Sequence, residues 1–277
     1  MNVRYIDTHC HLQLGQYEHD REELIEKMRA EDIIAIVVGD DYESSQMAVA
    51  LAEKHERLFA SVGVHPDHVK DFVNPSSDDG FTKSIIHELA KHPKVVAIGE
   101  CGFDFYRFPA NEATYSAEAT KAKQKELFKK HIALAAVLDK PLIIHARSSK
   151  GTSDAYQDLI EILKEAKKEY PNLRGVIHFF AGGVAEAKEF FALGFSISFT
   201  AVITFSHDYD AVIRAVPLAN ILSETDAPYV APASRRGQRN DPLAVIDVVN
   251  KIAEIRGEDP ELVRQTLLAN AKRLFVI

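Results

Sequence analysis

The sequence predicts an α/β protein with the (β/α)8 TIM-barrel fold and an extra C-terminal helix. Short apolar runs rich in β-branched residues alternate with amphipathic helical stretches along the chain, as in a parallel sheet with crossover helices. Eight such units within 277 residues match the size of a TIM barrel. Histidines and carboxylates stand at the ends of several apolar runs, where a barrel places its active site.

Each predicted strand is a near-continuous apolar run, which indicates burial on both faces of a parallel sheet. Several of the helical stretches between them end at a glycine or proline, as at Leu193-Gly194 and Lys140-Pro141. The predicted strands are Arg4–His9, Ile33–Val38, Leu58–Val64, Val95–Glu100, Pro141–His145, Gly175–His178, Phe195–Phe199 and Ile221–Glu224. The helices between them include Asp20–Ala30, Ser44–His55, Thr120–Leu138 and Ala185–Leu193.

The end of the chain, from Asp259 onward, predicts one more helix, which we expect on the outside of the barrel. Its leucines recur at helical spacing: Leu262, Leu267, Leu268 and Leu274. No repeat, low-complexity segment or linker divides the sequence, so we expect a single domain over residues 1–277. Two longer loops, Val73–Gly80 and Phe105–Ala119, follow strands on the active-site side and are expected to shape substrate access.

An open doubly wound sheet is the alternative arrangement of alternating strands and helices. Its dinucleotide-binding version carries a glycine-rich loop after the first strand. Here the segment Asp7-Thr8-His9-Cys10-His11 stands at that place instead. The sequence therefore favours the closed barrel.

The net charge of -8 argues against a protein that binds nucleic acid through a broad basic surface. It is compatible with an enzyme whose bound cations supply positive charge where a phosphate docks. No apolar run reaches the roughly 18 residues that cross a bilayer, so we expect no membrane partner. Cys10 and Cys101 are read as lone thiols, which suit the cytoplasm. No feature indicates an obligate protein partner.

Polar groups cluster at one predicted rim of the barrel. His9 and His11 are two residues apart on an extended segment, so their side chains point to the same side and can chelate one ion. Each of these residues taken singly is compatible with an ordinary residue at the edge of the core, but the convergence of the whole set predicts a metal site. His65, His145 and His178 end other strands, Glu100 ends the fourth strand, and Asp226 follows the eighth.

Glu100 gives a further reason to expect metal. It follows the apolar run Val-Val-Ala-Ile-Gly and has no basic partner nearby in the sequence. Burying an unpaired carboxylate costs several kcal/mol, which a bound metal ion removes.

Several motifs resemble, in order and spacing, those of the TatD-type deoxyribonucleases, and the resemblance covers nearly the whole chain. The motifs are Asp7-Thr8-His9-Cys10-His11-Leu12, Val62-Gly63-Val64-His65-Pro66, Gly99-Glu100-Cys101-Gly102-Phe103-Asp104, Pro141-Leu142-Ile143-Ile144-His145-Ala146-Arg147, Glu224-Thr225-Asp226-Ala227-Pro228-Tyr229 and Arg236-Gly237-Gln238-Arg239-Asn240. One departure is that His178-Phe179-Phe180-Ala181-Gly182 replaces the family's usual His-Cys-Phe-Ser-Gly. Contacts made by that cysteine and serine are therefore in question here.

The resemblance implies a TIM barrel with two divalent metal ions and DNase activity, commonly 3′→5′ exonuclease activity. It implies that His9, His11, Glu100 and Asp226 hold one ion. Glu100, bridging, joins His145 and His178 on the other ion. The implied substrate partner is the 3′ end of DNA, which we expect to be single-stranded.

We expect hydrolysis of the phosphodiester bond by a water activated between the two ions, with Asp226 as the proton acceptor and Glu100 as the bridge. His65 is assigned to the scissile phosphate; the alternative is a structural histidine before Pro66. Arg147 is a candidate phosphate clamp, because a guanidinium matches phosphate geometry. So are Arg235, Arg236 and Arg239, for which solvated surface is the alternative. Tyr106, Phe105 or Phe180 are candidates for stacking on a terminal base.

Ligand type leaves the metal open. Four imidazoles with two carboxylates favour zinc or another transition metal in the isolated protein. The resemblance to the family implies instead that Mg or Mn supports activity. Two rival functions share the barrel. One is an amidohydrolase or a phosphotriesterase- or lactonase-like hydrolase of a small molecule, whose bridging modified lysine is replaced here by Glu100. The other is a non-catalytic metal-binding scaffold.

Overall fold

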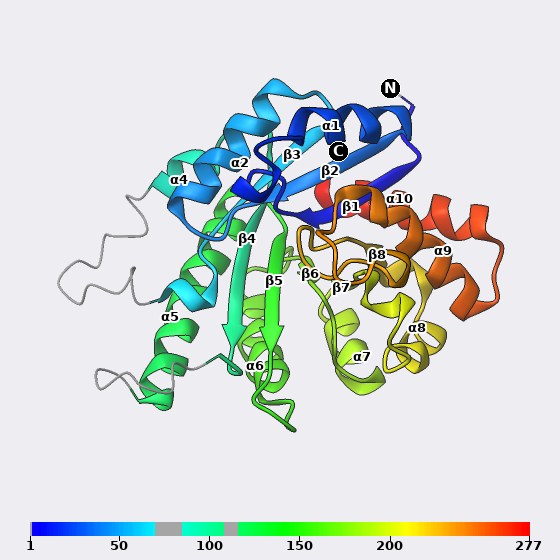
Figure 1. The fold of residues 1–277 in the computed structure, drawn as a ribbon. Helices are drawn as coiled ribbons and strands as arrows, with labels where there is room; N and C mark the ends of the chain where they lie inside the picture. The colour runs from blue at the N-terminus through cyan, green and yellow to red at the C-terminus, as the bar shows by residue number, and fades with distance from the viewer. Residues whose placement is uncertain (1, 70–84, 108–115) are drawn as a thin grey trace.

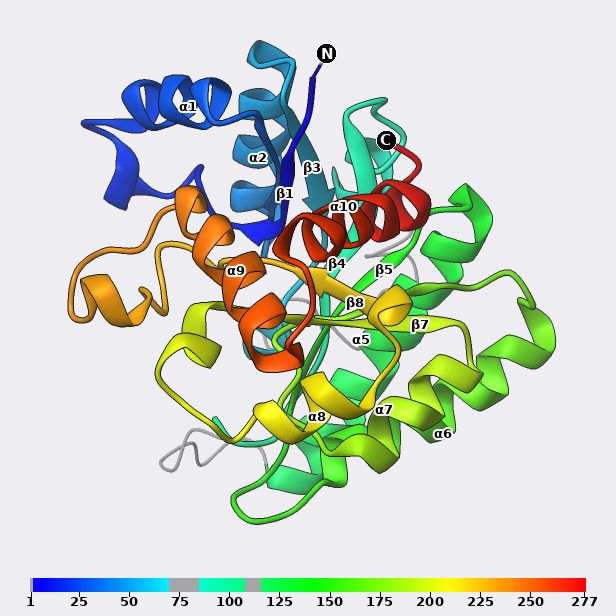
Figure 2. The same ribbon diagram turned by 90° about the vertical axis from the view of Figure 1, so that its right-hand side faces the viewer.

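The computed structural model describes residues 2–69, 85–107 and 116–277, and it confirms the predicted barrel (Figure 1). Eight parallel strands pair in chain order into one nearly closed sheet, and helices surround it (Figures 1 and 2). The strands are β1 Tyr5–Cys10, β2 Ile33–Val38, β3 Leu58–Val62, β4 Val95–Asp104, β5 Leu142–Arg147, β6 Gly175–Ile177, β7 Phe195–Phe199 and β8 Ile221–Ser223. The single domain over residues 1–277 stays a prediction.

The helices follow the strands in sequence. They are α1 Arg21–Ala30, α2 Tyr42–Lys54, α4 Ile85–Leu89, α5 Ala117–Leu138, α6 Asp154–Glu169, α7 Val184–Ala192, α8 Asp210–Ala215, α9 Val245–Arg256 and α10 Pro260–Phe275. Short 3-10 turns are η1 Gly15–Tyr17, η2 Pro66–His68, η3 Ala201–Thr204, η4 Leu218–Asn220, η5 Ala233–Arg235 and η6 Pro242–Ala244. In the described part of the chain, every helix is too short or too polar to cross a membrane.

Side chains complete the barrel where β8 meets β1. The Thr8 hydroxyl donates to the Ser223 carbonyl oxygen at 3.1 Å, and the Ser223 hydroxyl donates to the Ile6 carbonyl oxygen at 3.2 Å. A single parallel bridge joins Cys10 to Ala227. Hydroxyl groups thus take over part of the role that main-chain ladder bonds have between the other strands.

The strands are buried on both faces, as the continuous apolar runs predicted. Ile33, Ala35 and Val37 belong to the cluster that packs against the helices, whereas Ile34 and Ile36 belong to a second cluster. Successive strand residues point to opposite faces, so this second cluster fills the inside of the barrel. The polar site lies beyond it, at the carboxyl ends of the strands.

The helix α10 differs from the expectation of a position on the outside. Asp259 caps it by accepting from the main-chain N–H groups of Glu261 and Leu262. Its last turn places Leu274 and Phe275 in the apolar cluster inside the barrel. Helix α10 therefore covers the amino-terminal mouth of the barrel, where apolar interior side chains would otherwise meet water (Figure 2).

The strand β4 extends beyond its predicted end at Glu100 and reaches Asp104. Its pairing with β5 shifts register between Ile98 and Cys101. At Gly99 (φ +150°) a Cβ atom would lie 2.3 Å from the Ile143 carbonyl oxygen, so this close approach requires glycine. The irregularity sets Glu100 within a long strand. Of the two loops expected to shape access, Val73–Gly80 lies outside the described residues, and so do residues 108–115 of Phe105–Ala119.

Candidate metal centre

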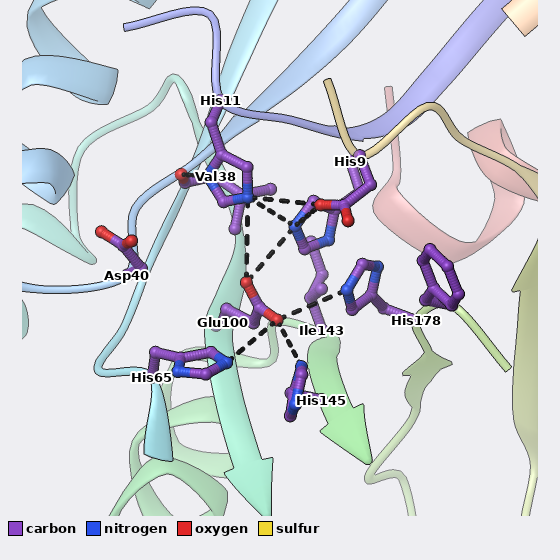
Figure 3. Close-up of polar contacts among 12 residues, drawn as sticks. His9, His11, Val38, Asp40, His65, Glu100, Ile143, His145 and His178 are labelled. Carbon is purple, nitrogen blue, oxygen red and sulfur yellow. Dashed lines mark hydrogen bonds and ion pairs between the residues drawn. The ribbon is translucent and has the colours of Figure 1, made fainter. Parts of the chain in front are cut away.

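The six predicted metal ligands meet at the carboxyl ends of the strands. Figure 3 shows five of them: His9, His11, Glu100, His145 and His178. The turn after β8 is tied to β1 by Asp7, which accepts from the main-chain N–H groups of His9 (3.1 Å) and Thr225 (2.9 Å). The Asp226 N–H in turn donates to the His9 carbonyl oxygen at 2.8 Å. These buried contacts bring the first and last strands' ligands together. The set is His9, His11, Glu100, His145, His178 and Asp226.

One half of the site contains His9 and His11. Their Nε2 atoms lie 3.1 Å apart. Glu100 Oε2 is 3.4 Å from His9 Nε2 and 4.0 Å from His11 Nε2. Asp226 Oδ1 is 3.8 Å and 3.5 Å from the same two atoms. Two imidazole nitrogens and two carboxylate oxygens thus converge on one small volume.

The other half is arranged around the second oxygen of Glu100. Its Oε1 lies 2.9 Å from His145 Nδ1 and 3.4 Å from His178 Nε2. His65 approaches the same oxygen, with Nε2 at 3.7 Å. Glu100 therefore faces one group of imidazoles with each oxygen, which is the geometry of a bridging ligand (Figure 3).

The electrostatics of Glu100 are set by its imidazole neighbours. Burial opposes its ionisation, but His9, His178 and His65 outweigh this effect and hold the pKa of the carboxyl well below its ordinary value. All of its ion-pair partners among the described residues are imidazoles. The sequence offers Glu100 no basic partner nearby along the chain, and these imidazoles come from distant positions.

Two of the histidines, His11 and His145, lie where the site favours positive charge. Burial lowers the pKa of His11, but the hydrogen bond to Asp226 more than compensates and raises it to about 9. For His145, burial is likewise outweighed, by Asp104 and Glu100, and its pKa is also about 9. Nitrogen and oxygen donors that stabilise a proton in this way also suit a divalent cation, and the mixed donor set fits zinc-like ions.

Each candidate histidine has an outer ring nitrogen, the one that does not face Glu100, and these outer nitrogens have different partners. His11 Nδ1 lies 2.9 Å from the Val38 carbonyl oxygen. His178 Nδ1 lies 3.0 Å from Glu224 Oε1, and His145 Nε2 lies 3.3 Å from Asp104 Oδ2. Sequence reasoning missed both carboxylates as parts of the site. The available signal was their presence in the Gly-Phe-Asp and Glu-Thr-Asp motifs.

A cavity of about 630 Å³ opens over the centre. Glu100, His145 and Asp226 are exposed to it, and so is His65. The predicted clamp Arg147 also lines the wall, with its guanidinium 4.2 Å from the centre of the Tyr106 ring. Sequence reasoning missed several other polar wall residues: Asp40, Asp67, His68 and Arg107.

The three loop arginines lie elsewhere and are not part of this cavity's described lining. Arg235 pairs with Asp241, and Arg239 pairs with Asp20. Arg236 places its guanidinium 3.8 Å from the centre of the Phe205 ring. All three guanidinium groups thus contact other side chains of the protein, which the sequence did not reveal.

The aromatic residues predicted to stack on a base, Tyr106, Phe105 and Phe180, do not line the cavity in the described part of the chain. Phe105 and Phe180 are buried at 2% and 1% exposure, so they are packing residues, whereas Tyr106 is 52% exposed. Within the segment that departs from the family's usual pattern, Phe179 adopts a positive φ of 47°. Three other aromatic residues line the cavity: Phe179, Tyr209 and Tyr229.

Comparison with known proteins agrees with this geometry. The family model described as TatD related DNase matches residues 6–276. The chain belongs to the TatD family. A Bacillus subtilis relative named uncharacterized metal-dependent hydrolase YabD is 36% identical over 274 residues, covering 98% of each chain. A Cronobacter sakazakii relative named 3'-5' ssDNA/RNA exonuclease TatD is 32% identical over 278 residues, covering 98% of this chain and 97% of that protein.

The fold is shared with a solved TatD homolog. The crystal structure of YJJV from Escherichia coli K12 superposes with a TM-score of 0.84 at 29% identity, covering 100% of both chains. Taken with the family match, the protein is a TatD-family metal-dependent hydrolase. The described residues include groups close enough together to hold a metal ion, among them His9, His11 and Glu100.

Proposed function

We propose that this hydrolase cuts phosphodiester bonds in DNA, removing nucleotides from a single-stranded 3′ end. The observation that carries the proposal is the position of Glu100, whose two oxygens face two groups of imidazoles at the base of a cavity that also presents arginines. A relative named as a 3'-5' ssDNA/RNA exonuclease supports the choice of substrate. The buried, free cysteines Cys10 and Cys101 support a cytoplasmic location, and we propose no obligate protein partner.

We assign the ligands to two divalent ions. His9, His11, Glu100 and Asp226 hold the first ion, and Glu100 bridges to the second. His145 and His178 complete the second set. When bound, a pair of such ions activates a water and stabilises the charge of the leaving oxygen. Mg or Mn supports activity in this proposal, and zinc or another transition metal accompanies the isolated protein.

Asp226 is the proposed proton acceptor. It lines the cavity, with its side chain 16% exposed, whereas the Glu100 side chain is only 5% exposed. The His11 hydrogen bond and neighbouring imidazoles outweigh burial and lower the pKa of Asp226, so its carboxylate is ionised and able to accept a proton.

His65 is the proposed donor to a phosphate oxygen. Its Nδ1 accepts from the Asp67 main-chain N–H at 3.1 Å, which leaves the proton of a neutral imidazole on Nε2. Burial lowers the pKa of His65 to about 3, so the ring is neutral near pH 7. The Nε2 atom lies 3.7 Å from Glu100 Oε1, and His65 lines the cavity, so an Nε2–H there suits hydrogen bonding to a phosphate oxygen close to the proposed ions.

Arg147 is the proposed phosphate clamp. It lines the cavity, and the Tyr106 ring restrains its guanidinium without neutralising it. Arg107, which pairs with Asp67 at 3.5 Å, is the second positive group on this wall. A role for Arg235, Arg236 and Arg239 stays a prediction, since it requires a substrate that extends past the cavity.

The proposal is tested with end-labelled single-stranded DNA. The metal-loaded protein is incubated with DNA labelled at its 5′ end, with a panel of lactones and small esters, and in parallel after metal removal. We expect progressive shortening of the DNA only when metal is present. Turnover of a lactone with intact DNA would favour the small-molecule hydrolase, and no turnover with bound metal would favour a scaffold.

A further inference from the structure

Two carboxylates that take no part in the proposed ligand set lie directly behind it. Asp104 and Glu224 are both 0% exposed. Each contacts the outer nitrogen of one candidate ligand, His145 or His178. Both of these histidines belong to the half of the centre arranged around Glu100 Oε1.

Glu224 accepts three hydrogen bonds. Oε1 receives the His178 Nδ1–H at 3.0 Å and the Phe179 main-chain N–H at 2.7 Å. Oε2 receives the Ser198 hydroxyl at 2.7 Å. The proton held on Nδ1 leaves the lone pair of His178 on Nε2, which faces Glu100. The same carboxylate supports Phe179 in its positive-φ conformation on the cavity wall.

Asp104, at the end of β4, contacts His145 on β5 in a similar way. Its Oδ2 lies 3.3 Å from His145 Nε2, which places the proton there and the lone pair on Nδ1, facing Glu100. Its Oδ1 accepts from the main-chain N–H groups of Tyr106 (2.9 Å) and Arg107 (2.8 Å). Asp104 thus joins a candidate ligand to the arginine side of the cavity.

Among the described residues, no carboxylate is hydrogen-bonded to an outer ring nitrogen in the other half, although a Glu224 carboxylate oxygen lies within 4.8 Å of a His9 ring nitrogen. His11 Nδ1 faces a neutral acceptor, the Val38 carbonyl oxygen. His9 Nδ1 is buried without a hydrogen-bond partner among the described residues. The two halves therefore differ in what lies behind their imidazoles, although both share Glu100.

We infer that Asp104 and Glu224 are positioning residues that set the metal affinity of the His145/His178 half and leave the His9/His11 half unaffected. The inference rests on the proposed metal centre. A carboxylate that accepts the outer N–H of a ligand histidine fixes its tautomer and ring orientation and makes the ligating nitrogen more basic. Loss of such a partner typically weakens metal binding by 10- to 100-fold.

The two amide substitutions are expected to weaken metal binding by different amounts. In Glu224→Gln the side-chain oxygen still accepts from His178 and Phe179, and the amide group donates to Ser198, so the charge is lost while the tautomer is kept. In Asp104→Asn the amide group facing His145 Nε2 donates, which drives the ring proton to Nδ1 and removes the ligating lone pair. We expect about 10-fold weaker binding for Glu224→Gln and about 100-fold for Asp104→Asn.

The experiment measures zinc content by elemental analysis after dialysis against buffered free Zn²⁺, and follows Co²⁺ titration by absorption spectroscopy. His11→Gln and His178→Gln assign the two binding steps to the two halves. Ser198→Ala is the matched control, because it removes a buried contact to Glu224 but leaves the bond to His178. Its metal affinity is expected to stay within about threefold of wild type, because the Glu224 carboxylate keeps its charge and its bond to His178.

We expect Asp104→Asn and Glu224→Gln to weaken only the step that His178→Gln abolishes. Unchanged binding of both equivalents, or equal weakening of both steps, would overturn the inference. If Glu224→Gln failed to fold, Asp104→Asn would test the same half independently. A wild-type protein that binds fewer than two equivalents would overturn the proposed centre itself and the inference with it, and this failure is recognised without any variant.

Discussion

Glu100 Oε1 lies 2.9 Å from His145 Nδ1, across the contact between β4 and β5. The other oxygen of the same carboxylate faces His9 and His11. One side chain therefore contributes to both halves of the proposed centre, and its loss affects both at once.

For Glu100→Gln we expect loss of the second metal equivalent and a decrease in kcat of at least about 1,000-fold. The neutral amide cannot bridge two cations, and its NH2 group would oppose one set of ligands. Elemental analysis and DNA cleavage assays check this. His87→Gln, which changes an imidazole away from the site, is the control. Two tightly bound equivalents in Glu100→Gln would contradict the bridging role.

Asp226→Asn separates metal binding from proton transfer. The amide oxygen can still face the His9/His11 half, but the side chain no longer accepts a proton. We expect retention of much of the bound metal and a decrease in kcat of about 100- to 10,000-fold, the range for general base catalysis. Single-turnover cleavage with metal analysis of the same sample measures both quantities. Near-normal kcat would assign the proton to another group.

Arg147→Met tests the phosphate clamp. Methionine keeps part of the aliphatic packing against Tyr106 but loses the charged fork. We expect KM for DNA to rise about 10-fold with kcat within about threefold, since charged hydrogen bonds contribute roughly 1.5–3 kcal/mol and part of this is screened. Arg4→Met is the matched control, because the Arg4 guanidinium lies 5.5 Å from the centre of the Tyr5 ring and outside the described lining of the cavity. Equal effects of the two substitutions would argue against a specific clamp.

The fold also contains a pH-sensitive buried histidine, His131. Its Nε2 accepts from the Val64 N–H at 3.0 Å, and its Nδ1 faces the Leu127 carbonyl oxygen at 2.9 Å. Burial lowers the pKa of His131 from 6.5 to about 4. Between pH 6.5 and about pH 4, His131 is protonated in the unfolded chain but not in the folded protein. The free energy of unfolding therefore decreases as the pH falls through this range, and the decrease ends below about pH 4.

The loss assigned to His131 approaches about 3 kcal/mol in the free energy of unfolding across this window. Urea unfolding of wild type and His131→Gln, measured from pH 7.5 to pH 4, checks it. Other groups titrate in both proteins, so the difference between the two profiles isolates His131. We expect a flatter profile for His131→Gln. Parallel profiles would mean that His131 titrates alike in both states.

The strands show how much of the fold could be predicted from local pattern. Ile33–Val38 and Phe195–Phe199 have the predicted bounds, because a strand buried on both faces reads as an uninterrupted apolar run. The end of β4 was predicted four residues early. Glu100 looks like the polar residue that ends a strand, but pairing with β5 continues to Asp104 opposite Arg147. Such pairing depends on a partner strand far along the chain.

The sequence by itself determined the barrel, the family and the set of residues suited to bind metal. The barrel and the metal-binding set follow from apolar periodicity and from residue types at strand ends, whereas the family follows from the resemblance of the motifs; all of these can be read along the chain. Only the tertiary structure decided which groups support that set and which charges remain free. Glu224 contacts His178, which is 46 positions away in the sequence, and Asp20 pairs with Arg239, which is 219 positions away. Contacts of this kind are made by folding, since hydrogen bonds and ion pairs require proximity in space and not in sequence.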